Sequence, residues 1–323
     1  MNETLNVSAP GRVNLIGDHT DYTGGLVMPM TLNAFTTVVG QKNTNRVWNL
    51  VSHHEAEPVS IALPVIDPRS ITPPWGRYVA GVLNEFNKLG YEIPGFTGVI
   101  DTTIPIGSGL SSSAALEIAI ARIVISITEI AMSETDLALL CQRAEHIASG
   151  VPCGIMDQLC IAVGRPNTAT LIDCHTYDVQ HIAMPEEIEV VTRFISQRTL
   201  VGSEYADRVN DCQAIEAIIG PLRLARMNDL SHLNDDRLVR RARHVISENQ
   251  RVRDFAHALT TGEFVEAGRL MTESHTSLAD DYETSNSTVD QAVNSMLHES
   301  GFLGARITGG GFGGCIVGLR HRG

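Results

Sequence analysis

The sequence predicts a globular protein that contains both strands and helices and is divided into two domains. Its 323 residues are about twice the usual size of one domain. Hydrophobic residues make up 43% of the chain and charged residues 19%, which excludes a disordered, collagen-like or coiled-coil protein. Strand patterns dominate the first half of the chain and helical patterns the second. We therefore expect domains over 1–184 and 185–323, with the boundary at Met184 and Pro185.

Hydrophobic periodicity places the individual elements in chain order. Strand-like alternation and β-rich composition predict strands at 5–9, 36–40, 47–51, 98–102, 168–173 and 190–196, with a glycine-rich strand closing the chain. Helical periodicity predicts helices at 75–89, from the serines near 113 to 130, and at 133–149, 202–247, 247–259, 264–279 and 288–300. Ser133 is the expected N-cap of its helix, with Asp136 in the first turn.

Charge and segment composition restrict the partners and the compartment. The net charge is −13 and the isoelectric point is about 5.3, which excludes a general electrostatic surface for nucleic acid. The longest apolar stretch, 114–131, contains Glu117, Arg122 and Glu129, so we predict a buried helix and no membrane span. The first residues lack a signal-peptide pattern, and the six cysteines lack metal or disulfide spacing. We therefore expect a cytoplasmic protein with reduced thiols.

Two segments are rich in glycine, a residue that lets the backbone come close to a ligand or to another segment. In 107–113, glycines and serines lead into a helix, which is typical of a phosphate site at a helix N-terminus. A plain glycine turn before a packed helix remains the alternative, since the segment is neither a Walker A loop nor a full dinucleotide fingerprint. The second segment, 309–314, fits G-x-G-x-x-G, but the sequence ends at Gly323 and leaves no room for a dinucleotide-binding unit. It indicates close approach to a ligand or to the first loop.

Three charged residues stand out by their positions. Asp157 lies in an apolar, small-residue stretch, where a buried charge requires a partner or a function. Glu145 borders the apolar stripe of its helix, so we expect it to point inward, where a metal ion or a salt bridge would account for it. Arg12 follows the first strand and could neutralise the aspartate or a phosphate through its planar guanidinium; a surface ion pair is the alternative.

A polar cluster occupies the long loop predicted over 11–29. Asp18, His19 and Asp21 place two carboxylates and one imidazole within four residues. Such a set could bind a metal, but hydrogen-bond acceptors also suit a ligand rich in hydroxyl groups. We interpret the loop as a sugar-binding segment.

These motifs together resemble the galactokinase family of the superfamily that also contains homoserine, mevalonate and phosphomevalonate kinases. The motifs that carry the resemblance are 11–22, 105–117 and 306–315, and further agreement lies at 75–82, 144–146, 152–158, 202–205 with Arg208 and Cys212, 241–248 and 274–278. The resemblance covers essentially the whole chain. It implies an α+β, two-domain GHMP kinase-like fold, with a ribosomal protein S5 domain 2-like N-terminal domain and a ferredoxin-like C-terminal domain.

The resemblance also implies roles for individual residues. Asp157 would be the catalytic aspartate, either removing the proton from the anomeric hydroxyl or orienting that hydroxyl, and Arg12 would keep it ionised and stabilise the transferring phosphoryl group. The implied ATP-binding residues are Gly107, Ser108, Gly109, Leu110, Ser111, Ser112, Ser113 and Ser52. The implied magnesium ligands are Ser113 and Glu145. The implied sugar-binding residues are Asp18, His19, Thr20, Asp21, Gly154 and Tyr205.

The implied activity is ATP- and Mg²⁺-dependent phosphorylation of D-galactose at its anomeric hydroxyl. Two departures from the family pattern accompany it. Asp18 stands where the family usually has Glu, and the chain stops at Gly323, soon after the third motif, which could leave a sheet edge uncovered. The alternatives are a 1-kinase for another sugar, such as N-acetylgalactosamine or arabinose, and a galactose sensor without turnover. The intact pair Ser113 and Ala114 argues against the sensor. We expect a monomer, with weak dimerisation as the alternative.

Overall fold

The computed structural model describes residues 4–197 and 204–323 of the chain. It divides into two compact units, each made of several chain segments. Unit 1 comprises Met1–Arg12, Leu32–Ile106 and Ser111–Val163. Unit 2 comprises Val13–Thr31, Gly107–Leu110 and Gly164–Gly323. Each unit is discontinuous in sequence, so the units differ from contiguous domains on either side of Pro185. The domain boundary at Met184 and Pro185 stays a prediction.

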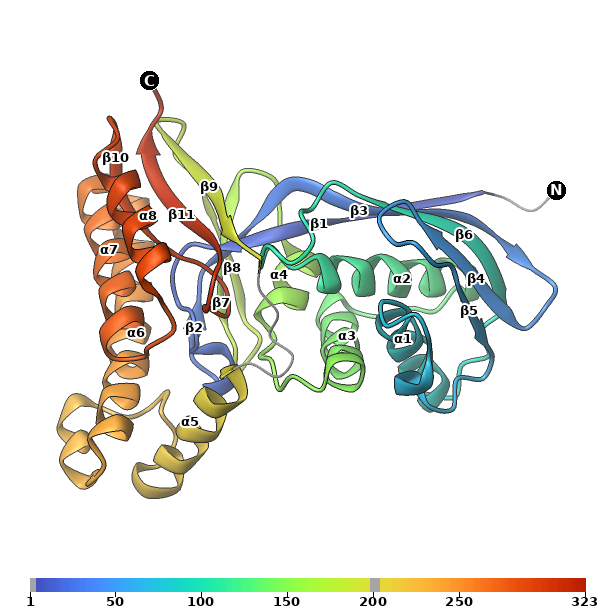
Figure 1. Cartoon of the computed structure of the whole chain (residues 1–323), viewed down its shortest axis with the longest axis horizontal. Helices are drawn as coiled ribbons and strands as arrows, with labels where there is room; N and C mark the ends of the chain where they lie inside the picture. Colours follow the sequence, from blue (N-terminus) through green and yellow to red (C-terminus); the bar gives the residue numbers. More distant parts are fainter. Residues whose placement is uncertain (1–3, 198–203) are drawn as a thin grey trace. The chain divides into compact units, whose positions relative to one another are not determined.

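Unit 1 is a mixed sheet with helices on one face (Figure 1). Its strands are β1 (Leu5–Asn14), β3 (Pro29–Asn43), β4 (Val47–Ser52), β5 (Val59–Ala62) and β6 (Gly95–Thr102). Strand β6 pairs antiparallel with β3 and parallel with β4, β4 pairs antiparallel with β5, and β1 pairs with β3. The helices are α1 (Gly76–Lys88), α2 (Ser112–Thr128), α3 (Glu134–Ser149) and α4 (Met156–Val163), with a 3₁₀ turn, η2, at Pro68–Ser70.

Apolar periodicity explains the helices of unit 1. In α1, Val79, Val82, Leu83 and Phe86 recur every three to four residues and are fully buried. In α3, the Ser133 hydroxyl accepts a hydrogen bond of 3.0 Å from the amide of Asp136, which confirms the predicted N-cap.

Unit 2 contains two groups of strands and a layer of helices. Strand β7 (Thr168–Asp173) pairs antiparallel with β2 (Leu26–Val27), with β8 (Val179–Ala183) and, at Met30, with the start of β3. A second sheet has the antiparallel order β10 (Phe302–Ile307), β11 (Gly314–His321) and β9 (Ile188–Ser196). The helices are α5 (Tyr205–Ile219), α6 (Asp236–Thr261), α7 (Phe264–Asp280) and α8 (Ser287–Leu297), with 3₁₀ turns η1 at Asp21–Thr23 and η3 at Met227–His232.

Several predicted boundaries in unit 2 are wrong. The helix expected over 202–247 is two helices, because α5 ends at Ile219 before Gly220 and Pro221; its expected start also lies outside the described residues. The expected break at Ser247 does not occur, and α6 runs through it to Thr261. The short strands β2, β5 and β8 and the helix α4 were not predicted. No disulfide joins the six cysteines in the described part of the chain, as expected.

Helix α7 and strand β10 approach closely because glycines face each other. A Cβ atom built on Gly304 would lie 1.9 Å from the carbonyl oxygen of Gly268. Figure 1 shows α7 and α8 beside β10 and β11. Their core includes Leu278, Val293, Ala305 and Ile316 among its buried residues.

Replacing Gly304 by alanine should therefore destabilise unit 2. The added methyl group must push two backbones apart, so we expect a loss of about 1–3 kcal/mol in the free energy of unfolding. Urea unfolding measures the loss. Gly323→Ala is the matched control, since a Cβ there has no neighbour within 4 Å. Equal midpoints for the two variants would contradict this packing.

Candidate functional site

The first glycine loop has the backbone geometry of an anion site. Gly107 (φ 74°), Gly109 (φ 81°) and Ser111 (φ 64°) take left-handed conformations on alternate residues. Such alternation turns successive N–H groups toward a common side, and α2 begins directly after it at Ser112. Anion binding by this loop stays a prediction.

Ser111 is the N-cap residue of α2, but its side chain does not cap the helix. Its side chain makes no capping hydrogen bond; instead, Ser111 Oγ donates to Asp157 Oδ2 at 2.5 Å. A left-handed conformation is unfavourable for a residue with a side chain, so a buried partner is needed to hold it. The loop and Asp157 are therefore linked directly.

Arg12 and Asp157 form a bidentate ion pair within unit 1. Arg12 Nε donates to Asp157 Oδ1 at 2.8 Å, and Arg12 Nη2 donates to Asp157 Oδ2 at 2.7 Å. Asp157 lies in the first turn of α4, with its side chain 30% exposed, whereas the Arg12 side chain is 4% exposed. Three donors thus hold the Asp157 side chain, which still reaches solvent. The structure confirms that Asp157 has a partner and that Arg12 is that partner.

Glu145 points inward, as predicted, beside a second carboxyl group. It is half-buried on α3 and interacts with Glu117 and Ser113 of α2. Burial raises the pKa of Glu145 to about 7, and the charge of Asp157 adds to this, although the contacts with Glu117 and Ser113 oppose it. Burial and the Glu145 charge also raise the pKa of Glu117, which accepts a hydrogen bond of 3.1 Å from Gln158 Nε2. Two adjacent carboxyl groups ionise together at low cost only beside a cation.

The oxygen atoms of Glu145 and Ser113 suit a hard divalent cation. No cluster of three or more His, Cys, Asp or Glu side chains that could hold a metal occurs among the described residues. Proteins often bind magnesium through one or two carboxylates together with substrate phosphates. Glu117 received no role from the sequence, yet it is a fully buried charge one helical turn after Ser113. That i, i+4 spacing was the available signal.

In unit 2, Asp18 is an internal counter-ion. Its carboxylate accepts a hydrogen bond of 2.8 Å from Asn14 Nδ2 and forms an ion pair with Arg306 Nη2. Asp18 is 1% exposed and Arg306 is fully buried. Within the described residues, Arg306 Nε and Nη1 have no hydrogen-bond partner. The sequence did not assign Arg306 a role of its own.

The other predicted sugar-binding residues of unit 2 differ in how their side chains are used. Thr20 is fully buried, and its hydroxyl lies 2.8 Å from the Gly17 carbonyl oxygen and 2.7 Å from that of Leu26, so it fastens the loop. The His19 ring lies 5.4 Å from the Tyr205 ring, which brings two predicted residues together. Asp21 begins η1.

Two predicted residues of unit 1 lie at element ends. Gly154 is buried two residues before α4, and so lies three residues before Asp157. Ser52 ends β4, where its Oγ accepts a hydrogen bond of 3.2 Å from the His54 amide. This hydrogen bond links Ser52 to His54, which is not one of the predicted site residues.

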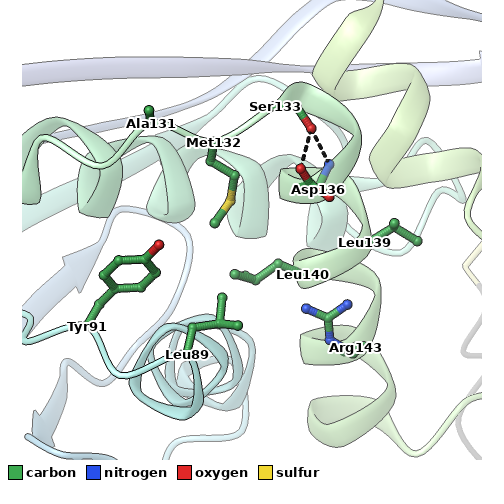
Figure 2. A pocket seen from close by; sticks show the side chains of 9 residues that line it. All are labelled: Leu89, Tyr91, Ala131, Met132, Ser133, Asp136, Leu139, Leu140 and Arg143. Carbon is green, nitrogen blue, oxygen red and sulfur yellow. Dashed lines mark hydrogen bonds between the residues drawn. The ribbon is translucent and has the colours of Figure 1, made fainter.

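A separate pocket of about 530 Å³ opens in unit 1 (Figure 2). Its lining is formed by Leu89, Tyr91, Ala131, Met132, Ser133, Asp136, Leu139, Leu140 and Arg143. Two of its polar groups serve the structure: Asp136 accepts from the Ser133 hydroxyl at 2.6 Å, and Arg143 Nε donates to Glu85 at 2.6 Å. The residues predicted for chemistry are absent from this described lining, so the pocket is not the candidate site.

His244 makes the stability of unit 2 depend on pH. Its Nε2–H donates to the Asp18 carbonyl at 3.1 Å, and Nδ1 lies 2.9 Å from Ser277 Oγ. Burial lowers the pKa of His244 to about 4, against the opposing charge of Glu248.

We therefore expect stability to fall as pH drops from about 6.5 to 4. In that window the unfolded chain binds a proton that the folded chain rejects, which costs roughly 3 kcal/mol at the lower end. Thermal unfolding between pH 8 and pH 4 measures the slope, and His244→Gln should flatten it. A slope that is the same in His244→Gln and the parent protein would refute this assignment.

Comparison with known proteins places these features in a class. A family model described as "GHMP kinases N terminal domain" matches residues 77–165, and one described as "GHMP kinases C terminal" matches 255–322. A crystal structure of a mevalonate kinase has the same fold, with a TM-score of 0.70 at 19% identity over 98% of this chain and 91% of that one. The α+β fold with its glycine loop is thus that of a GHMP kinase, as expected.

Closer relatives define the family. The model described as "Galactokinase galactose-binding signature" matches residues 2–42. Galactokinase of Bos taurus is 40% identical over 98% of this chain and 83% of its own length, and galactokinase of Chloroflexus aggregans is 41% identical over 96% and 82%. The crystal structure of Lactococcus lactis galactokinase complexed with galactose has a TM-score of 0.93 at 31% identity, covering 99% of this chain and 86% of that one. The chain belongs to the galactokinase family and is an ATP-dependent sugar kinase. None of the helices in its described part combines the length and apolar character that a membrane crossing needs.

Proposed function

We propose that this protein transfers the γ-phosphoryl group of ATP to the anomeric oxygen of D-galactose. A bond forms between that oxygen and phosphorus, and the bond between phosphorus and the β,γ-bridging oxygen breaks, releasing ADP. The carrying observation is Asp157, a partly exposed carboxylate fixed by Arg12 and Ser111. Asp157 orients the anomeric hydroxyl and accepts its proton as the new bond forms.

Arg12 supports this step in two ways. Its bidentate contact holds the Asp157 carboxylate in place, and its positive charge stabilises the negative charge on the transferring group. Because both donors meet one carboxylate in a planar arrangement, lysine would not replace it.

The glycine loop would bind the ATP phosphates. The proposal covers Gly107, Ser108, Gly109, Leu110, Ser111, Ser112 and Ser113, with Ser52 near the nucleotide. Support comes from the alternating left-handed conformations and the helix N-terminus that follows them. Ser113 and Glu145 would hold Mg²⁺, which supplies charge neutralisation on the phosphates when bound. Glu117 would position Glu145 through their contact.

Sugar binding would divide between contact residues and loop-holding residues. We assign contact with the sugar to His19, Asp21 and Tyr205, together with the backbone at Gly154. Asp18 and Thr20 are assigned a positioning role, because their polar atoms are engaged by Arg306, Asn14 and backbone carbonyls. Similarity to the galactokinase solved with galactose supports galactose as the sugar.

Three further features are part of the proposal. We propose domains at 1–184 and 185–323. Their boundary lies between the two GHMP kinase family matches, which cover 77–165 and 255–322. We assign the protein to the cytoplasm. We assign it a monomeric state, with weak dimerisation as the alternative.

A sugar panel tests the function. ADP release from Mg·ATP is measured with galactose, glucose, N-acetylgalactosamine, arabinose and galacturonate, with Asp157→Asn as the blank. Turnover with galactose that disappears in the blank supports the proposal. Turnover with another sugar instead would assign a different 1-kinase, and galactose binding without turnover would assign a sensor.

A further inference from the structure

Four hydrogen-bonding groups, three on buried residues and one on the partly buried Tyr22, form a series that ends at His19 in unit 2. Cys212 Sγ lies 3.1 Å from Tyr282 Oη, Tyr282 Oη lies 2.8 Å from Tyr22 Oη, and Tyr22 Oη lies 2.9 Å from His19 Nδ1. Cys212, Tyr282 and His19 are 2%, 0% and 4% exposed. Sequence separations of 70 and 260 residues show that the fold, and not local structure, assembles the series.

Counting donors and acceptors favours one direction for the hydrogen atoms in this series. Each tyrosine hydroxyl and the thiol carries one hydrogen. If Cys212 donates to Tyr282, Tyr282 to Tyr22, and Tyr22 to His19 Nδ1, all three hydrogens have an acceptor within the series. In the reverse direction the buried thiol hydrogen has none there. The first arrangement leaves the neutral imidazole of His19 with its hydrogen on Nε2.

Neighbouring side chains and backbone groups fix the positions of these hydrogen-bonded residues. Arg208 Nε donates to the Tyr282 carbonyl oxygen at 2.7 Å, and Arg208 Nη2 donates to that of Glu283 at 2.9 Å. The Tyr282 ring packs 4.8 Å from the His19 ring and 4.6 Å from the His244 ring. The backbone of His19 is left-handed (φ 65°), a conformation that persists only where neighbours fix it.

We infer that Cys212, Tyr282 and Tyr22 are positioning residues for sugar recognition, which hold His19 as the Nε2–H tautomer so that it presents a donor to an oxygen atom of the sugar. The inference rests on the proposed contact between His19 and the sugar. It gives a function to a thiol and two hydroxyl groups that the phosphoryl-transfer step does not use. The recognised group is a sugar oxygen with an available lone pair, a hydroxyl or the ring oxygen.

Removing single oxygen atoms tests the inference. Tyr22→Phe and Tyr282→Phe keep both rings but interrupt the series, so we expect the KM for galactose to rise about three- to tenfold while the KM for ATP stays constant. Cys212→Ser keeps a donor and should resemble the parent. Tyr91→Phe is the matched control, because that hydroxyl lies on the unrelated pocket of unit 1 and should affect neither constant.

A spectroscopic readout separates positioning from loss of fold. In the full-length protein with ¹⁵N-labelled histidine, ¹H–¹⁵N NMR should show the His19 hydrogen on Nε2, with mixed tautomers in Tyr22→Phe. A hydrogen on Nδ1 in the parent, or an unchanged tautomer and an unchanged galactose KM in Tyr22→Phe, would overturn the inference. Absence of galactose-dependent turnover in the parent protein would instead overturn the proposed function.

Discussion

Asp157→Asn should lower kcat with galactose by about 10²- to 10⁴-fold, the range expected when a positioned proton acceptor is lost. Asparagine has nearly the same shape, but its amide cannot take the proton and accepts hydrogen bonds through one oxygen only. Arg12 would then keep one of its two contacts and lose its counter-charge. Steady-state ADP release measures the effect, and circular dichroism checks the fold.

The matched control for Asp157→Asn is Asp101→Asn. Asp101 is a carboxylate of the same unit, 57% exposed and paired with His54 at 2.9 Å. The same chemical change at this surface position should leave kcat unaltered. If Asp157→Asn turned over galactose at the rate of the Asp101→Asn control, Asp157 would not be the catalytic carboxylate.

Arg306→Met should destabilise the protein by about 3–5 kcal/mol, because it leaves the Asp18 charge buried with Asn14 alone beside it. The free energy of unfolding in urea measures the loss. The buried guanidinium of Arg306 also lowers the pKa of Glu248. That pKa is about 2, because the charges of Arg251, His244 and Arg306 lower it while burial raises it. Loss of Arg306 therefore removes a nearby positive charge from both Asp18 and Glu248.

A double variant separates charge from packing in this pair. Asp18→Asn with Arg306→Met removes both charges, so we expect it to regain much of the stability lost in Arg306→Met. Additive losses in the two single variants would show that the ion pair is not coupled, and would contradict the role of Asp18 as an internal counter-ion.

Local sequence signals identified the elements that carry the site. The Ser133 cap, the helix after the serines and the strand ending near Arg12 depend on spacing within a few residues, and the structure confirms them. The partnership of Arg12 and Asp157 was also accessible, because an aspartate in an apolar stretch requires a counter-charge.

Two other contacts between distant segments could not be read from the sequence. Asp18 meets Arg306 across 288 residues, and Tyr22 meets Tyr282 across 260. The residues next to them in the sequence do not indicate these pairings. Helix α4 was missed because its eight residues are too few, and too largely apolar outside Asp157 and Gln158, to show a helical period.

The central claim is that phosphate is transferred to the anomeric oxygen of galactose. ³¹P and ¹H NMR of the products from galactose and Mg·ATP tests it directly. We predict one sugar phosphate, with phosphorus coupled to the anomeric proton, formed in equal amount to ADP. Phosphate on another carbon, or ADP formed with free phosphate and unchanged galactose, would contradict the account.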